Sequence, residues 1–235
     1  MTGILVTRPL DDSRGLSEAL KSLGYDPLVE PMLTIRYRNE TPPSRDYQAV
    51  LATSANGVRA LARLVAWRDL PVWAVGDASA RAARDLGFVT VASAAGDVAA
   101  LAALVAERVD PAAGPLLHVA ASRLAGDLGG ALATEGFAVE KAVLYEAEPA
   151  EDFSPAFMTA LAEDRLSAAL FFSPRTAATF ARLAEKRRIG ESLRRIRALA
   201  LSRPVAEALS PLPWRAVTAA ERPDQAALLA LLDGV

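Results

Sequence analysis

Short apolar runs alternate along this chain with longer stretches in which apolar residues recur at helical spacing. The short runs are apolar at nearly every position, as expected of strands buried on both faces of a sheet. Each run is bounded by turn or capping residues and is followed by a helical pattern, which predicts βα units and parallel sheets. The predicted strands are Ile4–Thr7, Ala49–Thr53, Val72–Val75, Leu116–Val119, Ala168–Phe172 and Ala198–Leu201.

The same series of βα units occurs twice. Matching residues are separated by offsets that rise steadily along the chain from 112 to 127 residues, as an old duplication with small insertions would produce. The predicted fold class is therefore α/β, with two similar parallel-sheet α/β/α lobes from an internal duplication. Matched pairs include Ile4 with Leu116, Ser54 with Ser173, Val75 with Leu201 and Asp97 with Asp224.

Two segments interrupt this rhythm, Met32–Pro43 and Lys141–Pro149. Both are extended, partly alternating in polarity, closed by prolines, and equivalent in the two repeats, so they can pair as a two-stranded connector that the chain crosses twice. A tandem pair of domains divided near residue 112 is the alternative. The predicted division is lobe 1 over 1–36 and 149–235, lobe 2 over 43–141, and connector strands over 37–42 and 142–148.

The amino-acid composition excludes several classes of ligand and of catalytic site. Hydrophobic residues make up 52% of the chain, enough for a substantial core, and the formal net charge of −2 creates no overall field to attract nucleic acid or an anionic membrane. The absence of cysteine excludes disulfides and thiolate catalysis. His118 is the only histidine and lies in the middle of a predicted strand, so we interpret it as a core residue; a typical zinc site and a Ser-His-Asp relay are excluded.

The expected location is cytoplasmic. The N-terminal residues enter a short strand without the apolar core of a signal peptide. No apolar run approaches the roughly 18 residues that span a bilayer.

Small hydroxyl residues gather where predicted strands lead into helices. Ser54 and Ser173 are placed to cap helix N-termini, with Pro174 at a first helical position. Any one of them is most simply a cap. Several helix N-termini facing one cleft, however, form an array of N–H donors suited to a ligand with several carboxylates or phosphates, and ligands gather at the carboxyl ends of parallel strands.

Standard nucleotide-binding motifs are missing: neither G-x-G-x-x-G after the first strand nor a P-loop sequence occurs. Tyr145 lies on the second connector segment and is the phenol expected to face a cleft between the lobes. An enzyme with these residues would work by positioning and hydrogen bonding rather than through a strong acid, base or nucleophile.

Several motifs, in matching order over the full length, resemble the uroporphyrinogen-III synthase family. The motifs are Val6-Thr7-Arg8-Pro9, Leu51-Ala52-Thr53-Ser54-Ala55-Asn56-Gly57-Val58, Val75-Gly76-Asp77-Ala78-Ser79-Ala80, Leu144-Tyr145, Phe172-Ser173-Pro174-Arg175 and Ala206-Glu207-Ala208-Leu209.

The resemblance implies two α/β lobes on a β connector and a cyclising hydro-lyase of tetrapyrrole (haem) biosynthesis. Its substrate would be hydroxymethylbilane, a linear tetrapyrrole with eight carboxylates, closed to uroporphyrinogen III with inversion of ring D through a spiro intermediate. No cofactor and no metal are implied. Tyr145 would donate a hydrogen bond to the departing hydroxyl. The implied substrate-binding residues are Arg8, Thr53, Ser54, Ser79, Ser173 and Ser202.

Two turns depart from the family pattern. After the Ala198–Leu201 strand, Ser202-Arg203-Pro204-Val205 supplies a single hydroxyl. After Leu116–Val119 the chain reads Ala120-Ala121-Ser122-Arg123, where the alternatives are that Arg123 substitutes for the family's Arg-Gly or that this contact is absent. The expected partner is the small-molecule substrate alone, with no nucleic acid, no membrane and a monomeric chain. The alternatives are a non-catalytic two-lobed binding protein for a small polyanion and a phosphosugar-handling α/β enzyme, which would need a base that the sequence does not supply.

Overall fold

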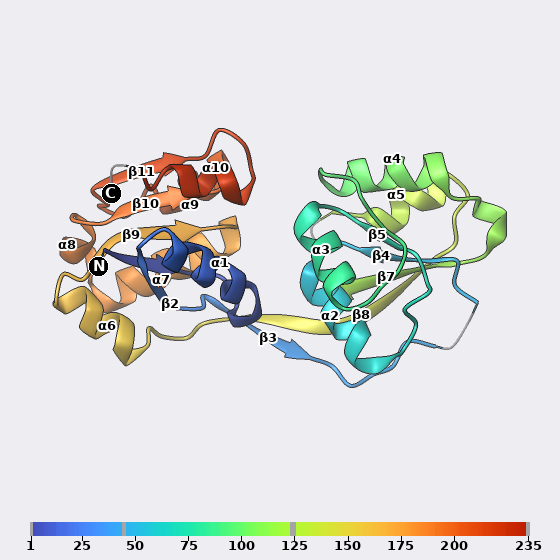
Figure 1. Ribbon diagram of the computed structural model, residues 1–235, viewed down its shortest axis with the longest axis horizontal. Helices are drawn as coiled ribbons and strands as arrows, with labels where there is room; N and C mark the ends of the chain where they lie inside the picture. The colour runs from blue at the N-terminus through green and yellow to red at the C-terminus, as the bar shows by residue number, and fades with distance from the viewer. Residues whose placement is uncertain (1, 44–45, 123–125, 234–235) are drawn as a thin grey trace. The chain divides into compact units, whose positions relative to one another are not determined.

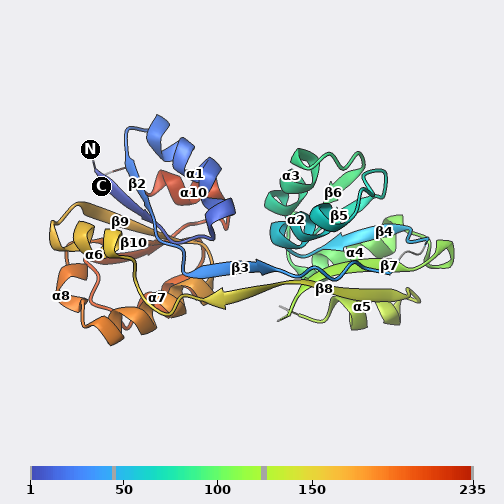
Figure 2. The same cartoon turned by 90° about the horizontal axis from the view of Figure 1, so that it is seen from below.

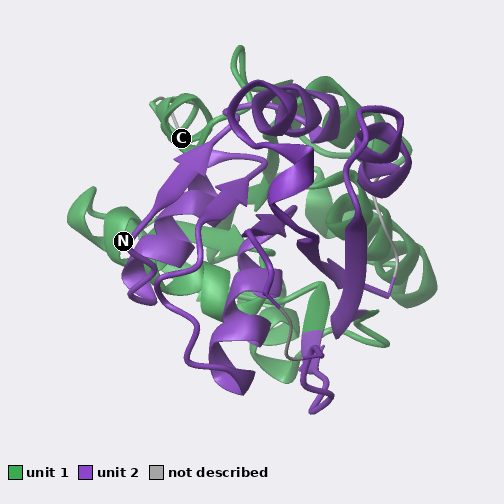
Figure 3. Cartoon of the chain, turned by 90° about the vertical axis from the view of Figure 1, so that its right-hand side faces the viewer, with its two compact units in different colours: residues 1–34, 148–235 green, residues 35–147 purple. Residues whose placement is uncertain are grey.

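A computed structural model describes residues 2–43, 46–122 and 126–233. The chain forms two compact units: unit 1 comprises 1–34 and 148–235, and unit 2 comprises 35–147 (Figure 3). The chain passes between the units twice, within strands β3 (Leu33–Tyr37) and β8 (Val139–Pro149) (Figure 1). Each unit contains residues from both sequence repeats.

Unit 1 is a three-layer α/β structure around a parallel sheet with the strand order β11-β10-β9-β1-β2. One core cluster lies between the sheet and α6, α7 and α9, and another between the opposite face and α1 and α10. The strands are β1 (Gly3–Val6), β2 (Asp26–Val29), β9 (Leu166–Phe171), β10 (Arg197–Ala200) and β11 (Ala216–Ala219). The helices are α1 (Leu10–Ser22), α6 (Pro155–Ala162), α7 (Pro174–Arg187), α8 (Gly190–Leu193), α9 (Arg203–Leu209) and α10 (Gln225–Ala230).

Unit 2 has a sheet in the order β3-β8-β7-β4-β5-β6. Its core is again split in two, with α2 and α3 over one face and α4 and α5 over the other. The remaining strands are β4 (Ala49–Ala52), β5 (Val72–Ala74), β6 (Val91–Ser93) and β7 (Leu116–Ala121). The helices are α2 (Ala55–Leu64), α3 (Asp77–Asp85), α4 (Val98–Arg108), α5 (Leu128–Thr134) and the 3₁₀ turn η1 (Pro111–Ala113).

The repeat in the sequence accounts for the two strand orders. At the offsets found above, β1 and β2 correspond to β7 and β8, while β4, β5 and β6 correspond to β9, β10 and β11. The orders β2-β1-β9-β10-β11 and β8-β7-β4-β5-β6 are then the same order written twice. Within this shared order, the strands of one repeat meet those of the other once, at β1 against β9 and at β4 against β7, and β3 is an additional edge strand of the unit 2 sheet. The predicted α/β fold with two parallel-sheet lobes is confirmed.

Strand β8 has a different partner on each side. Its first half pairs in parallel with β7, beginning with Val139 opposite Leu116. On its other edge it lies beside β3 (Figure 2), where the Arg38 N–H donates to the Leu144 carbonyl and the Ala150 N–H to the Met32 carbonyl. Residue numbers rise on one strand as they fall on the other, so this pair is antiparallel.

The first crossing strand lies earlier than the sequence predicted. β3 occupies Leu33–Tyr37, whereas the predicted strand covered 37–42. The apolar residues Leu33, Ile35 and Tyr37 alternate with exposed ones and face the protein, while Asn39 and Glu40 are exposed. The prolines that follow have no N–H with which to extend the ladder. β8 is longer than the predicted 142–148, because its first residues continue the parallel sheet.

All six strands predicted from apolar runs are present. The three strands without a prediction, β2, β6 and β11, each lie at an edge of a sheet. Their residues are partly exposed, so their sequences lack the continuous apolar run of a central strand. Every described helix is too short or too polar to span a bilayer.

Candidate functional site

The predicted site residues lie at the carboxyl ends of the two sheets, close to the repeat junctions. Such junctions reverse the strand order, and loops leaving the two central strands turn to opposite sides there. Thr53, Ser54, Ser79 and Tyr145 belong to unit 2, and Arg8, Ser173 and Ser202 belong to unit 1.

In unit 2 a serine and a tyrosine that are 91 residues apart share a short hydrogen bond. Ser54 Oγ lies 2.6 Å from Tyr145 OH, and either atom could be the donor. Ser54 is also the N-cap of α2, since its Oγ accepts the Gly57 N–H at 3.1 Å. The cap predicted at this position is confirmed. It also places the Tyr145 phenol over the first turn of α2, where the helix dipole favours negative charge.

An irregularity in β8 brings Tyr145 to this position. Val143 pairs with Ala120, but the next partner of β7, Ala121, pairs with Tyr145 instead of Leu144. Consecutive residues of a regular strand point to opposite faces, yet Leu144 and Tyr145 both pack into the cluster beneath α2 and α3. Tyr145 is 7% exposed.

The N-terminus of α2 lies close against β7. A Cβ added to Gly57 would lie 2.8 Å from the Val119 carbonyl oxygen, which is too close for an unstrained contact. Glycine at this position therefore lets the helix approach the strand. The close approach helps to set the position of Ser54, three residues earlier.

Thr53, next to Ser54, is paired with the buried histidine. Thr53 Oγ1 lies 3.3 Å from His118 Nε2, and His118 is 3% exposed. Burial, and to a lesser degree the positive charge of Lys141, lowers the pKa of His118 from 6.5 to about 4. His118 is therefore a neutral core residue at pH 7 that helps to orient Thr53.

The depressed pKa of His118 predicts a loss of stability in mild acid. The unfolded chain binds a proton near pH 6.5 and the folded chain only near pH 4, so the free energy of unfolding falls as the pH drops through this window. We expect His118 to account for a loss of roughly 2 kcal/mol by pH 5. Urea unfolding of the wild type and of His118→Gln at pH 7 and pH 5 measures it. Equal losses in both proteins would contradict the prediction.

In unit 1 the equivalent serine is engaged within its own helix. Ser173 is the N-cap of α7, accepting the Thr176 N–H at 3.1 Å, and Pro174 is the first helical residue, as predicted. Thr176 Oγ1 donates to the Ser173 carbonyl at 2.8 Å and lies 2.9 Å from Ser173 Oγ. In this arrangement the Ser173 hydroxyl donates to Thr176, which leaves one acceptor lone pair for a ligand.

Arg8 lies across the β1–β9 junction from the strand it follows. Its guanidinium carbon is 4.5 Å from the centre of the Phe172 ring, a cation–π distance. Thr7, before it, is completely buried and donates its hydroxyl to the Leu170 carbonyl at 2.7 Å, so Thr7 joins β1 to β9. The planar guanidinium of Arg8 therefore stacks on the Phe172 ring at the carboxyl end of the sheet.

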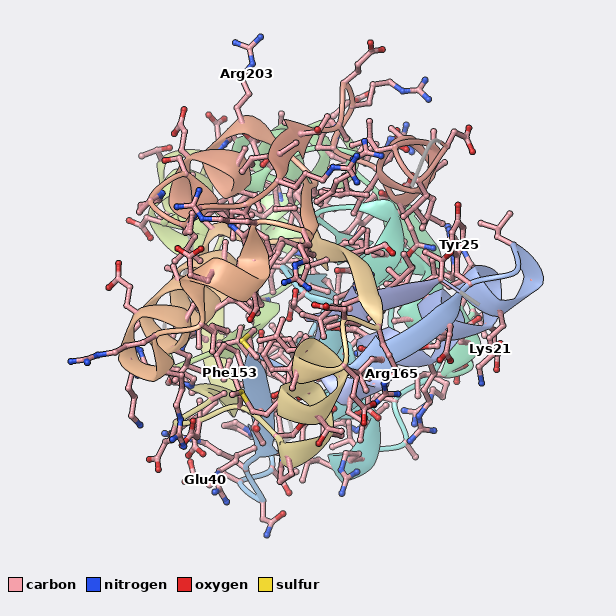
Figure 4. The ribbon with its side chains drawn as sticks, turned by 90° about the vertical axis from the view of Figure 1, so that its left-hand side faces the viewer. Lys21, Tyr25, Glu40, Phe153, Arg165 and Arg203 are labelled. Atoms are coloured by element: carbon pink, nitrogen blue, oxygen red, sulfur yellow. The ribbon has the colours of Figure 1, made fainter. Side chains whose placement is uncertain are left out.

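The other predicted residues also lie at the carboxyl ends of strands. Ser79 is buried in the first turn of α3, after β5. Ser202 precedes α9 as its N-cap but makes no side-chain capping bond. Arg203 is exposed and points away from unit 1 (Figure 4). Arg123, the candidate substitute in the altered turn after β7, lies outside the described residues.

Sequence reasoning missed two side chains that shape the site, Phe172 and Thr176. Phe172 ended a predicted strand, and no local signal marks it as the support of Arg8. Thr176 was detectable, because a hydroxyl three residues after an N-cap serine can reach back to the cap. Among the described residues, no three His, Asp or Glu side chains converge as a metal site requires.

Comparisons with known proteins match one family model and several solved structures of similar fold. A family model described as uroporphyrinogen-III synthase HemD matches residues 14–230. The chain is similar to the structure of uroporphyrinogen-III synthetase from Helicobacter pylori, with 18% identity, a TM-score of 0.65 and coverage of 99% of this chain and 98% of that one. It is also similar to a mutant uroporphyrinogen III synthase from the extremely thermophilic bacterium Thermus thermophilus, with 22% identity, a TM-score of 0.54 and the same coverage. No sequence among the curated proteins matches significantly. At these identities the structural likeness shows a shared fold.

Proposed function

The chain belongs to the uroporphyrinogen-III synthase family, and from this premise we propose that it converts hydroxymethylbilane into uroporphyrinogen III. The observation that carries the proposal is the phenol of Tyr145, hydrogen bonded to Ser54 over the first turn of α2. A hydroxyl group is a poor leaving group unless it receives a proton. A positioned phenol meets that need without histidine, thiolate or carboxylate chemistry.

The proposed reaction begins at the hydroxymethyl group of the substrate. The pyrrole nitrogen releases electrons, the C–O bond breaks, and the hydroxyl leaves as water with a proton from Tyr145, giving an azafulvene. The ring D carbon that carries the last bridge attacks the new methylene and forms a spiro intermediate. This intermediate fragments, and the ring recloses through the other α carbon, which then loses a proton. The net change is loss of one water with ring D inverted.

The protein's main task in this scheme is to control the conformation of the linear tetrapyrrole. Closure without an enzyme joins the unsubstituted ring D carbon directly and gives the uninverted isomer. The enzyme must hold the chain in the folded conformation in which the substituted carbon is nearer. Fixed hydrogen-bond donors at strand ends suit this task, because they do not reorganise during the reaction.

We propose that substrate carboxylates and polar groups bind at the carboxyl ends of the sheets. Arg8 has a planar set of donors that fits a carboxylate, and its stacking on Phe172 limits its motion. Thr53 and Ser79 supply small hydroxyls next to helix N-termini in unit 2, and Ser202 does so in unit 1. Ser173 has one acceptor lone pair left, which suits a pyrrole N–H of the substrate rather than a carboxylate. A substrate with eight carboxylates needs such local groups, since the net charge of the chain is −2.

The test is a product analysis. Freshly generated hydroxymethylbilane is added to the folded protein, and the uroporphyrinogen isomers are separated after oxidation. We expect isomer III in clear excess over a protein-free control, which yields isomer I. Isomer I alone from correctly folded protein would contradict the proposal and favour the non-catalytic binding protein.

A further inference from the structure

The Ser54 hydroxyl makes two hydrogen bonds that point to a role different from contact with substrate. It accepts the Gly57 N–H at 3.1 Å and lies 2.6 Å from the Tyr145 oxygen. A serine hydroxyl has one proton and two lone pairs. The backbone amide can only donate, so it occupies one lone pair. The proton of Ser54 is then available for the phenol oxygen.

We propose that Ser54 is a positioning residue that acts through Tyr145: it donates its proton to the phenol oxygen and stabilises the negative charge left there when Tyr145 protonates the departing hydroxyl. The proposal rests on the proposed function and deepens it. The proton of Tyr145 moves to the leaving oxygen, which departs as water, and the electron pair of the broken O–H bond stays on the phenol oxygen. The phenol regains a proton from the ring D carbon later in the same turnover.

The geometry fits stabilisation of a transient phenolate. An O–H donor lies about 2.5–2.7 Å from a charged oxygen acceptor, and the Ser54–Tyr145 distance is 2.6 Å. The Gly57 N–H polarises the serine hydroxyl further, since it belongs to the first turn of α2. Charge on Tyr145 would therefore be shared along a chain of donors that ends at a helix N-terminus.

Two independent features hold the pair in place. The absence of a side chain at Gly57 lets α2 lie against the Val119 carbonyl, which brings Ser54 close to the sheet. The shifted register after Ala120 turns Tyr145 toward the α2 face. The serine at the equivalent position in unit 1, Ser173, bonds within α7 instead.

The experiment is a double-mutant cycle on turnover to isomer III at saturating hydroxymethylbilane. Ser54→Ala is expected to lower kcat about tenfold with little change in KM, because one hydrogen bond to a charged oxygen is lost. In a Tyr145→Phe background the same change is expected to lower kcat by less than about twofold. An equal loss in both backgrounds, or a change confined to KM, would overturn the proposal.

Further variants separate the proton of Ser54 from its role as a helix cap. Ser54→Thr keeps both and is expected to retain most of the wild-type kcat. Ser54→Asp keeps a capping oxygen but has no proton to donate at pH 7, so its kcat should fall at least as far as that of Ser54→Ala. Wild-type kcat in Ser54→Asp would refute the role.

The control is a variant that loses the N-cap of another helix, one that covers the opposite face of the unit 2 sheet from the cluster containing Tyr145. Asp97 caps α4 by accepting the Ala100 N–H at 2.9 Å, and Asp97→Ala should leave kcat unchanged. Circular dichroism of every variant checks its folding. A wild type that forms no isomer III would refute the proposed function itself, an outcome distinct from an active wild type with an unaffected Ser54→Ala.

Discussion

Tyr145→Phe is expected to lower the rate of isomer III formation about 100-fold, within the range of general acid catalysis. The ring stays in the cluster beneath α2 and α3, and only the hydroxyl next to Ser54 is removed. Ser54 keeps its bond from the Gly57 N–H, so α2 retains its cap and the fold should change little. Initial rates, with the isomers separated after oxidation, measure the effect.

Tyr25→Phe is the matched control for the loss of a phenol. The Tyr25 hydroxyl donates to the Leu232 carbonyl at 3.2 Å in unit 1, away from the carboxyl ends of the strands. Figure 4 shows Tyr25 on the same side of the unit as Lys21. This variant should keep wild-type turnover. Full turnover in Tyr145→Phe, with circular dichroism unchanged, would show that the phenol is not the proton donor.

Phe180→Ala is expected to destabilise unit 1 by about 4 kcal/mol. Phe180 is completely buried in α7 and its ring centre lies 5.1 to 5.9 Å from those of Phe153, Phe157, Phe171 and Trp214. Its removal leaves a cavity at the centre of this aromatic cluster, on the sheet face covered by α6 and α7. Urea unfolding monitored by tryptophan fluorescence reports the change, because Trp214 stacks on Phe180.

Leu23→Ala provides the comparison within the same unit. Leu23 is 57% exposed after α1, and its truncation should change the free energy of unfolding by less than about 0.5 kcal/mol. The core clusters of unit 2 do not include Phe180. Any unfolding transition that belongs to unit 2 should therefore keep its midpoint urea concentration. Comparable losses from Phe180→Ala and Leu23→Ala would contradict the central place of the aromatic cluster.

The sequence was sufficient for features set by neighbouring residues. Continuous apolar runs predicted the central strands because both faces of those strands are buried, and the rising offsets predicted two similar sheets. The caps at Ser54 and Ser173 were predictable because a cap bonds to an amide three residues away. The edge strands β2, β6 and β11 escaped prediction because their partial exposure removes the continuous apolar pattern.

The tertiary structure decided the contacts between distant residues. Glu30 is 3% exposed and accepts the N–H of Ser154, which lies 124 residues later in the sequence, at 2.8 Å. No local sequence pattern predicts this hydrogen bond. Arg8 stacks on Phe172 only because β1 and β9 are neighbours in the sheet.

The hydrogen bond between Tyr145 and Ser54 shows most clearly which features follow from the sequence and which depend on the tertiary structure. By itself the sequence determined that Ser54 caps a helix at the carboxyl end of a strand and that Tyr145 lies on an extended segment. It did not determine which hydroxyl meets the phenol, because that depends on a one-residue shift between β7 and β8 and on how closely α2 approaches Val119. Strand register and helix packing follow from the combined burial of many side chains, so they emerge only when the whole sheet is assembled.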